Sequence, residues 1–212
     1  MHHRRAGFTL VEVLISASLL GGLLLVAGLA TDRAMQLFRQ RRASEEVNSS
    51  ASRLLQRITS ELTFARLSSF APVPNAPLGS STLTFRTCQG VTAGAVQWSS
   101  TVTLRWELDS GEADDDADNN GNGLIDEGML VRIENLGLAG EQRVVLEHGL
   151  CEFQPGESFD GADEDGDGLI DETGLSFVLQ GEVLTIQLGL MGTGPGGNVM
   201  TKVVETAVRI RN

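Results

Sequence analysis

Two short acidic segments hold most of the residues in this sequence that could do chemistry. Residues 112–127 contain seven Asp or Glu and residues 157–172 contain eight, with no Lys or Arg in either segment. Within them ADNNGNGLIDE, at 117–127, aligns without gaps on ADEDGDGLIDE, at 162–172. Oxygen-bearing side chains at alternate positions around a glycine turn suit Ca²⁺, which takes about six to eight oxygen ligands. We therefore predict one or two calcium sites.

The two copies offer their ligands in the same order. The pattern resembles the aspartate-rich calcium loops of EF-hand, dockerin and thrombospondin type 3 modules, although Gly174 stands where a true EF-hand has its twelfth-position Glu. Two Asn lower the charge of the first copy, so we expect calcium to favour the second; the alternative is a pair of solvated acidic turns. The candidate ligands are Asp163, Asp165, Asp167, the Leu169 carbonyl, Asp171 and Glu172 in the second copy, and Asp118, Asn120, Asn122, the Leu124 carbonyl, Asp126 and Glu127 in the first.

The charge of the rest of the chain excludes some classes of protein. The net charge is −12, and removing the fifteen acidic charges of the two segments leaves −12 + 15 = +3. The acidity therefore belongs to the two segments, which favours cations as ligands and argues against nucleic acid. Outside the first three residues the chain has one histidine, His148, and it contains no nucleophile elbow, zincin motif or phosphate loop. We do not expect an enzyme.

An apolar run near the N-terminus carries a single charge. Residues 8–30 contain no Asp, Glu, Lys or Arg except Glu12, and a helix of this length reaches roughly 35 Å, enough to cross a bilayer. Arg4 and Arg5 precede the run, so the N-terminus is expected in the cytoplasm and the bulk of the chain outside. An ionisable group inside a membrane helix costs at least ~2.5 kcal/mol, which indicates a function for Glu12.

The residues around Glu12 resemble a known processing signal. RAGFTLVE, from Arg5 to Glu12, is similar to the prepilin motif of type IV pilins and of the pseudopilins of type II secretion. The resemblance implies that a prepilin peptidase cuts after Gly7, that Phe8 becomes the N-methylated first residue, and that Glu12 neutralises the terminal ammonium of a neighbouring subunit. The alternatives are a secretory signal or plain anchor for the run, and a Glu12 that snorkels to the interface.

The remaining pattern predicts the fold. From Thr31 apolar residues recur every three or four positions through Ala65, and a helix is expected to end by Ser69 or Phe70, before three prolines. Beyond Pro77 the period falls toward two. We predict an α+β fold in which a long N-terminal helix packs on an antiparallel sheet, as in pilins, with the acidic segments inserted at hairpin ends. The strand candidates are 83–85, 102–108, 129–133, 143–153, 175–180, 182–190 and 200–211.

These patterns divide the chain into four parts. We expect a leader at 1–7, a transmembrane and filament-core helix at 8–30, an amphipathic half-helix at 31–70, and a β-rich globular domain at 71–212 with acidic insertions at 112–128 and 157–174. Cys88 and Cys151 form an even pair on the oxidising side of the membrane, so we predict one disulfide; the alternative is two buried thiols.

The resemblance also implies a function. Because the globular domain is larger and more decorated than a filament shaft requires, the leading hypothesis is a minor pilin of the W type that primes assembly or lies at the tip. A J-type pseudopilin of type II secretion, suggested by the terminal VRIRN, is the alternative, and a calcium-dependent adhesin is a third. The expected partners are other pilin subunits and the inner-membrane assembly machinery. The expected location is the bacterial inner membrane as a single-pass protein, and then a periplasmic or cell-surface filament.

Overall fold

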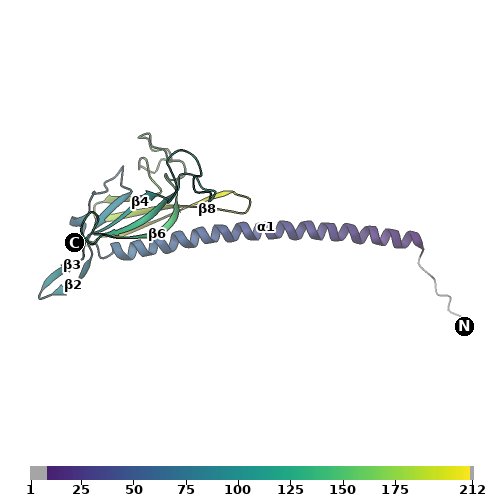
Figure 1. Ribbon diagram of the computed structural model, residues 1–212, viewed down its shortest axis with the longest axis horizontal. Coiled ribbons are helices and arrows are strands. Elements are labelled where there is room, and N and C mark those ends of the chain that lie inside the picture. The colour runs from purple at the N-terminus through teal and green to yellow at the C-terminus, as the bar shows by residue number, and fades with distance from the viewer. Residues whose placement is uncertain (1–8, 211–212) are drawn as a thin grey trace. The chain divides into compact units, whose positions relative to one another are not determined.

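The computed structural model describes residues 9–210, which form one long α-helix, a short 3₁₀ helix and nine β-strands (Figure 1). The chain divides into two compact units, residues 1–42 and 43–212, with the boundary inside the long helix. The second unit contains the sheet and both acidic segments. This arrangement of a long N-terminal helix and an antiparallel β-domain confirms the predicted α+β fold.

The long helix, α1, runs from Leu10 to Leu62, and its first part is apolar and exposed. Every described residue from Thr9 to Arg42 is exposed, and the most apolar window of the helix has a mean hydropathy of 2.3. By length and composition this part can cross a membrane, as expected. Its apolar side chains are therefore left for lipid or for other subunits rather than for the chain's own core.

The last part of α1 packs on the sheet. Apolar residues repeat there at helical spacing and share one core with the strands, so the amphipathic pattern is confirmed for this stretch. The helix ends earlier than expected, because Ala65 pairs with Thr87 and the N–H of Arg66 donates to the Arg86 carbonyl at 2.9 Å. The 3₁₀ helix η1, Leu67–Ser69, follows. The residues that α1 buries are Ala51, Leu54, Leu55, Ile58 and Leu62.

Seven strands form one antiparallel sheet in the order β1-β4-β5-β6-β8-β7, with β9 paired to β8. The strands fall close to the predicted ranges, and turns occur at Gly181 and within residues 194–198. Phe85 and Phe177 are fully buried between the sheet and α1. The strands are β1 Thr82–Phe85, β4 Val102–Leu108, β5 Gly128–Glu134, β6 Gln142–Leu150, β7 Leu175–Gln180, β8 Val183–Thr193 and β9 Val199–Arg209.

A separate hairpin was not predicted. It consists of β2, Cys88–Thr92, and β3, Ala95–Trp98, and it pairs with no strand of the larger sheet. No residue of either strand is buried, so the sequence carries no alternation of buried and exposed positions there. The guanidinium of Arg66 lies 5.2 Å from the centre of the Trp98 ring, a cation–π contact at the base of the hairpin.

The two acidic segments leave the sheet in different ways. The first connects β4 and β5, which pair with each other, so it ends a hairpin as predicted. The second connects β6 and β7, which do not pair, and the expectation of a hairpin end is wrong there. Leu150 of β6 and Leu175 of β7 pair with Leu190 and Leu188 of β8. The two strands therefore lie end to end along one edge of β8, and the second segment is an excursion between them.

The predicted disulfide is not formed. Both cysteines carry free thiols, Cys88 exposed at the start of β2 and Cys151 buried after β6. Cys151 packs so closely on Gly189 that a Cβ there would lie 2.2 Å from its sulfur, whereas Cys88 belongs to the separate hairpin. The two thiols thus face different neighbours. Burial raises the pKa of Cys151 to about 12, as for an inert structural thiol.

Candidate functional site: two acidic loops

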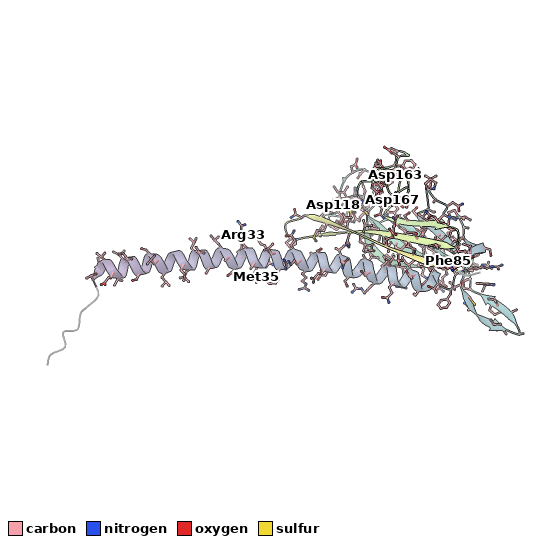
Figure 2. The ribbon with its side chains drawn as sticks, turned by 180° about the vertical axis from the view of Figure 1, so that it is seen from behind. Arg33, Met35, Phe85, Asp118, Asp163 and Asp167 are labelled. Carbon is pink, nitrogen blue, oxygen red and sulfur yellow. The ribbon has the colours of Figure 1, made fainter. Side chains whose placement is uncertain are left out.

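Loop 1, residues 109–127, and loop 2, residues 154–172, share a set of hydrogen bonds donated by equivalent backbone N–H groups. Each residue of loop 2 lies 45 positions after its counterpart, since 154 − 109 = 45. The N–H of Asp109 donates to the Glu127 carbonyl at 3.0 Å, and that of Gln154 donates to the Glu172 carbonyl at 2.8 Å. The structural repeat is therefore longer than the aligned sequence segment. Figure 2 labels Asp118, Asp163 and Asp167, which lie in these loops outside the sheet.

The first carboxylate of each repeat organises the glycine turn. Asp163 accepts hydrogen bonds from the N–H groups of Gly166, at 2.7 Å, and Gly168, at 3.0 Å. Asp118 accepts the equivalent bonds from the glycines of loop 1 at 2.7 and 2.9 Å. Gly166 has a φ of +79°, which a residue with a Cβ adopts only at a cost. Both turns are thus built around the carboxylates predicted as first ligands.

Two of the predicted ligands hold other parts of their loops. Asp126 accepts hydrogen bonds from the N–H groups of Asp115, at 3.2 Å, and Asp116, at 2.8 Å. Asp171 accepts the N–H groups of Asp160 and Gly161 at 3.0 and 2.8 Å. These carboxylates therefore close the first half of each loop onto its second half. The Leu124 and Leu169 side chains are buried and anchor the loops to the domain.

The structure adds one carboxylate to each loop that we did not predict as a ligand. Glu157 is only 8% exposed, and its Oε1 accepts the N–H of Asp165 at 3.3 Å. Carboxylate oxygens of Glu157, Asp163 and Asp165 all lie within 4.8 Å of one another, an arrangement that can hold a metal ion. In loop 1 the counterpart Glu112 accepts the N–H of Asn120 at 2.8 Å. The sequence could have indicated these two Glu, because a Gly-Glu pair lies the same number of residues before each copy of the repeat.

A buried carboxylate ends each loop, and its surroundings differ between them. In loop 1 the Oε1 of Glu127 accepts the side-chain amides of Asn120, at 2.8 Å, and Asn122, at 2.5 Å. In loop 2 the corresponding neighbours of Glu172 are Asp165 and Asp167, which have no amide to donate. The buried Oε2 atoms of three Glu find no hydrogen-bond partner in the described residues; they belong to Glu127, Glu157 and Glu172.

Loop 2 therefore concentrates uncompensated negative charge. Burial, together with the charges of Asp167, Glu157 and Asp165, raises the pKa of Glu172 to about 7. Burial also raises the pKa of Glu157, assisted by Glu164. Like charges crowded at a buried site cost free energy that protonation or a bound cation relieves. The chemistry of this oxygen-only set suits a hard divalent cation.

At the other end of the chain, Glu12 has a partner within its own helix. Its carboxylate Oε2 accepts the N–H and the hydroxyl of Thr9, each at 3.1 Å, and the Glu12 N–H donates to the Thr9 Oγ1 at 3.2 Å. This reciprocal arrangement is a capping box, which satisfies N–H groups at the start of a helix. The predicted cleavage residues Gly7 and Phe8 lie outside the described residues.

Comparison with known proteins identifies the class of this chain. The family model described as the prokaryotic N-terminal methylation motif matches residues 2–28. Neither the curated proteins nor the solved structures include a match to the chain. With the long apolar helix and the α+β fold, the motif supports a type IV pilin-like protein, a pilin or pseudopilin in the general sense.

The motif also carries general consequences. Proteins with it are structural subunits rather than enzymes, they are processed by a prepilin peptidase, and they assemble with other pilin subunits. The apolar part of α1 is consistent with anchoring in the inner membrane.

Proposed function

We propose that this chain is a minor pilin, present in few copies, that primes a type IV pilus or lies at its tip. The observation that carries the proposal is the pair of acidic loops outside the sheet, with sixteen Asp and Glu between them. A shaft repeats one subunit many times at close spacing, and loops of this charge would repel one another along it. A subunit used once or a few times avoids that repulsion. A J-type pseudopilin is the alternative, since the same motif serves both systems.

The proposal is tested by counting copies and by deleting the gene. Quantitative mass spectrometry of sheared filaments should give far fewer copies of this chain than of the shaft subunit, and deletion should reduce or abolish filaments. A copy number equal to that of the shaft subunit would overturn the proposal. Loss of protein secretion with intact pili would identify the pseudopilin instead, and intact filaments that lose only attachment would identify a calcium-dependent adhesin.

We propose further that Gly7 and Phe8 form the cleavage site and that Phe8 is methylated. The mature chain would then begin one residue before Thr9, which forms the capping box with Glu12. Intact-mass measurement of the filament protein should give a chain that starts at methylated Phe8. Gly7→Val should retain the leader. An unprocessed chain inside filaments contradicts this proposal.

Glu12 is proposed to neutralise the Phe8 ammonium of a neighbouring subunit in the filament. Its bonds with Thr9 provide a competing explanation, that it only caps its own helix. Glu12→Gln separates the two, because Gln also serves in a capping box but carries no charge. We expect Glu12→Gln to enter the membrane yet fail to join filaments, while Thr9→Val, which removes the hydroxyl of the cap and keeps the charge, still joins. The reverse pattern would support capping alone.

We also propose Ca²⁺ as the ion of the acidic loops, in one or two sites. The support is the oxygen-only donor set, in which carboxylates of Glu157, Asp163 and Asp165 converge. Ca²⁺ accepts many oxygens at flexible geometry, whereas Mg²⁺ retains several waters and requires near-octahedral ligands. Calcium is available on the outer side of the membrane, where the ectodomain of a processed pilin would lie.

A further inference from the structure

We propose that loop 2 is the tighter cation site and that Glu157 and Glu172 close it from either end. The five ligand side chains are Glu157, Asp163, Asp165, Asp167 and Glu172. Loop 1 has the same backbone arrangement but is the weaker site, because the side-chain amides of Asn120 and Asn122 already donate to Glu127. This inference rests on the proposal that Ca²⁺ is the ion, and it is independent of the role in the filament.

The first support is a pair of buried carboxylates that each have one oxygen without a hydrogen-bond partner. Glu157 is 8% exposed and Glu172 is 3% exposed, and the Oε2 of each finds no hydrogen-bond donor in the described residues. A buried ionised group without a partner is costly, and native proteins retain such groups where a ligand satisfies them. Glu157 is directed into the cluster, because its carboxylate lies within 4.8 Å of those of Asp163 and Asp165.

The second support is the fit of this cluster to a calcium-sized ion. Two oxygens bound to the same Ca²⁺ at about 2.4 Å can be no more than about 4.8 Å apart. Carboxylate oxygens of Glu157, Asp163 and Asp165 lie within this limit, so they are close enough together to share one Ca²⁺.

The third support is the contrast with loop 1 at two matched positions. In loop 1 the oxygens of Asn120 and Asn122 accept the N–H groups of Asn122 and Leu124, and their amides turn to Glu127. In loop 2 one oxygen of Asp165 and one of Asp167 accept the same two N–H groups, at 3.0 and 2.8 Å. The second oxygen of each Asp then takes the place of an amide donor. Loop 2 therefore places three carboxylates together, those of Asp165, Asp167 and Glu172, where loop 1 has one carboxylate and two amide donors. A bound cation would compensate the repulsion between these three charges.

A cation in this position also joins the two ends of the excursion between β6 and β7. Gln154 accepts the N–H of Glu157 and donates its own N–H to the carbonyl of Glu172, so both ligands are attached to one backbone position. Gly189 of β8 bonds to Cys151 on one side of the loop and to Gly174 on the other, at 3.0 and 2.7 Å. Ion binding therefore stabilises the junction of three strands.

Titration of the full-length protein in detergent with CaCl₂ tests the ligand assignment. Calorimetry gives the affinities, and native mass spectrometry gives the number of ions. Glu157→Gln should weaken the tighter site at least tenfold. Glu112→Gln, the matched change in loop 1, should leave that site within twofold. Equal losses of calcium affinity in the two variants would overturn the ligand assignment, but not the proposal that the protein binds calcium.

Exchange of the Asp and Asn pairs tests the contrast and includes a gain of function. Asn120→Asp with Asn122→Asp should raise the affinity of loop 1 at least tenfold, so that two ions bind tightly. Asp165→Asn with Asp167→Asn should abolish the tighter site and raise the melting temperature of the metal-free protein, because Glu172 gains amide donors. No gain of a tight site in the first variant would overturn the inference. No calcium binding in the wild type would overturn the calcium proposal as well, and neither result affects the filament proposal.

Discussion

Loop 1 and loop 2 have the same backbone design and differ in how the charge of their last carboxylate is met. Both build a glycine turn around an Asp, at Asp118 and Asp163, and both end on a buried Glu. Loop 1 meets that Glu with two side-chain amides, and loop 2 surrounds it with carboxylates. Two Asn-to-Asp differences in one fold thus separate a loop whose last carboxylate accepts two side-chain amides from a loop whose last carboxylate has carboxylates as its neighbours.

The largest difference is expected at the glycines that follow the two loops, Gly174 and Gly128, when a side chain is introduced there. A Cβ at Gly174, after loop 2, would lie 1.7 Å from the carbonyl oxygen of Cys151, a backbone atom. A Cβ at Gly128, after loop 1, would lie 2.1 Å from the Trp106 ring, which can move. We expect Gly174→Ala to cost about 4 kcal/mol or to prevent folding, and Gly128→Ala to cost about 1–3 kcal/mol.

Thermal unfolding followed by fluorescence of the two tryptophans, Trp98 and Trp106, measures both changes. Gly166→Ala, where space is open and only the positive φ opposes a side chain, is the control and should cost about 1 kcal/mol. A smaller loss for Gly174→Ala than for Gly128→Ala would show that the exit of loop 2 is the looser one.

Removal of calcium should destabilise the protein through loop 2. At a calcium concentration about 100 times the Kd, binding adds about 2.7 kcal/mol, which corresponds to roughly 5–10 °C in melting temperature. A chelator should remove this increment from the wild type and from Asn120→Ala with Asn122→Ala. It should have little effect on Asp165→Ala with Asp167→Ala. The measurement is the melting temperature of the full chain, and an equal response of both double variants would remove the ranking of the loops.

The pH dependence of the metal-free protein should reveal the same difference. The pKa of Glu172 is raised from an ordinary 4.5 to about 7 in the folded state. The folded protein therefore binds this proton more tightly than the unfolded chain does, and the associated stability is full below pH 4.5 and is lost as the pH rises through 7. We expect a melting temperature a few degrees higher at pH 5.5 than at pH 7.5.

The control for this prediction is Glu172→Gln, which removes the titrating group. The difference between the wild type and this variant isolates Glu172 from the other carboxylates of the domain. Saturating calcium should abolish the trend in the wild type, because the bound ion keeps the carboxylate ionised. A difference between the two proteins that does not change with pH contradicts the prediction.

The smallest effect concerns the exposed tip of loop 2. Phe159 is 83% exposed, and its counterpart in loop 1 is Asp114, so chymotrypsin has a preferred site in loop 2 alone. Calcium should slow cleavage after Phe159 about threefold to tenfold, because cleavage requires local opening of the loop. Mass spectrometry of the fragments gives the site and the rate. Unchanged cleavage with calcium would place the ion away from this part of the loop.

Several features of the fold were predictable because they follow from local patterns. The spacing of apolar residues along the chain predicts the apolar run, the helical repeat through Leu62 and the strands β4 and β7. The hairpin of β2 and β3 was missed because it buries nothing. The prediction of a disulfide was wrong, because the number of cysteines does not say which residues surround each of them in the fold.

The sequence by itself determined the class of the protein, the repeat of the acidic loops and the order of their candidate ligands, since all three depend on residues close together in the chain. Only the tertiary structure decided that β6 and β7 share one edge of β8. It also brought Glu157 to Asp163 and Asp165, and it turned Asp126 and Asp171 to backbone N–H groups. The physical reason is that burial and charge are properties of a place in the fold. The sequence shows that Asp165 and Asn120 differ in charge, but only the fold shows that each lies beside a buried carboxylate, Glu172 or Glu127.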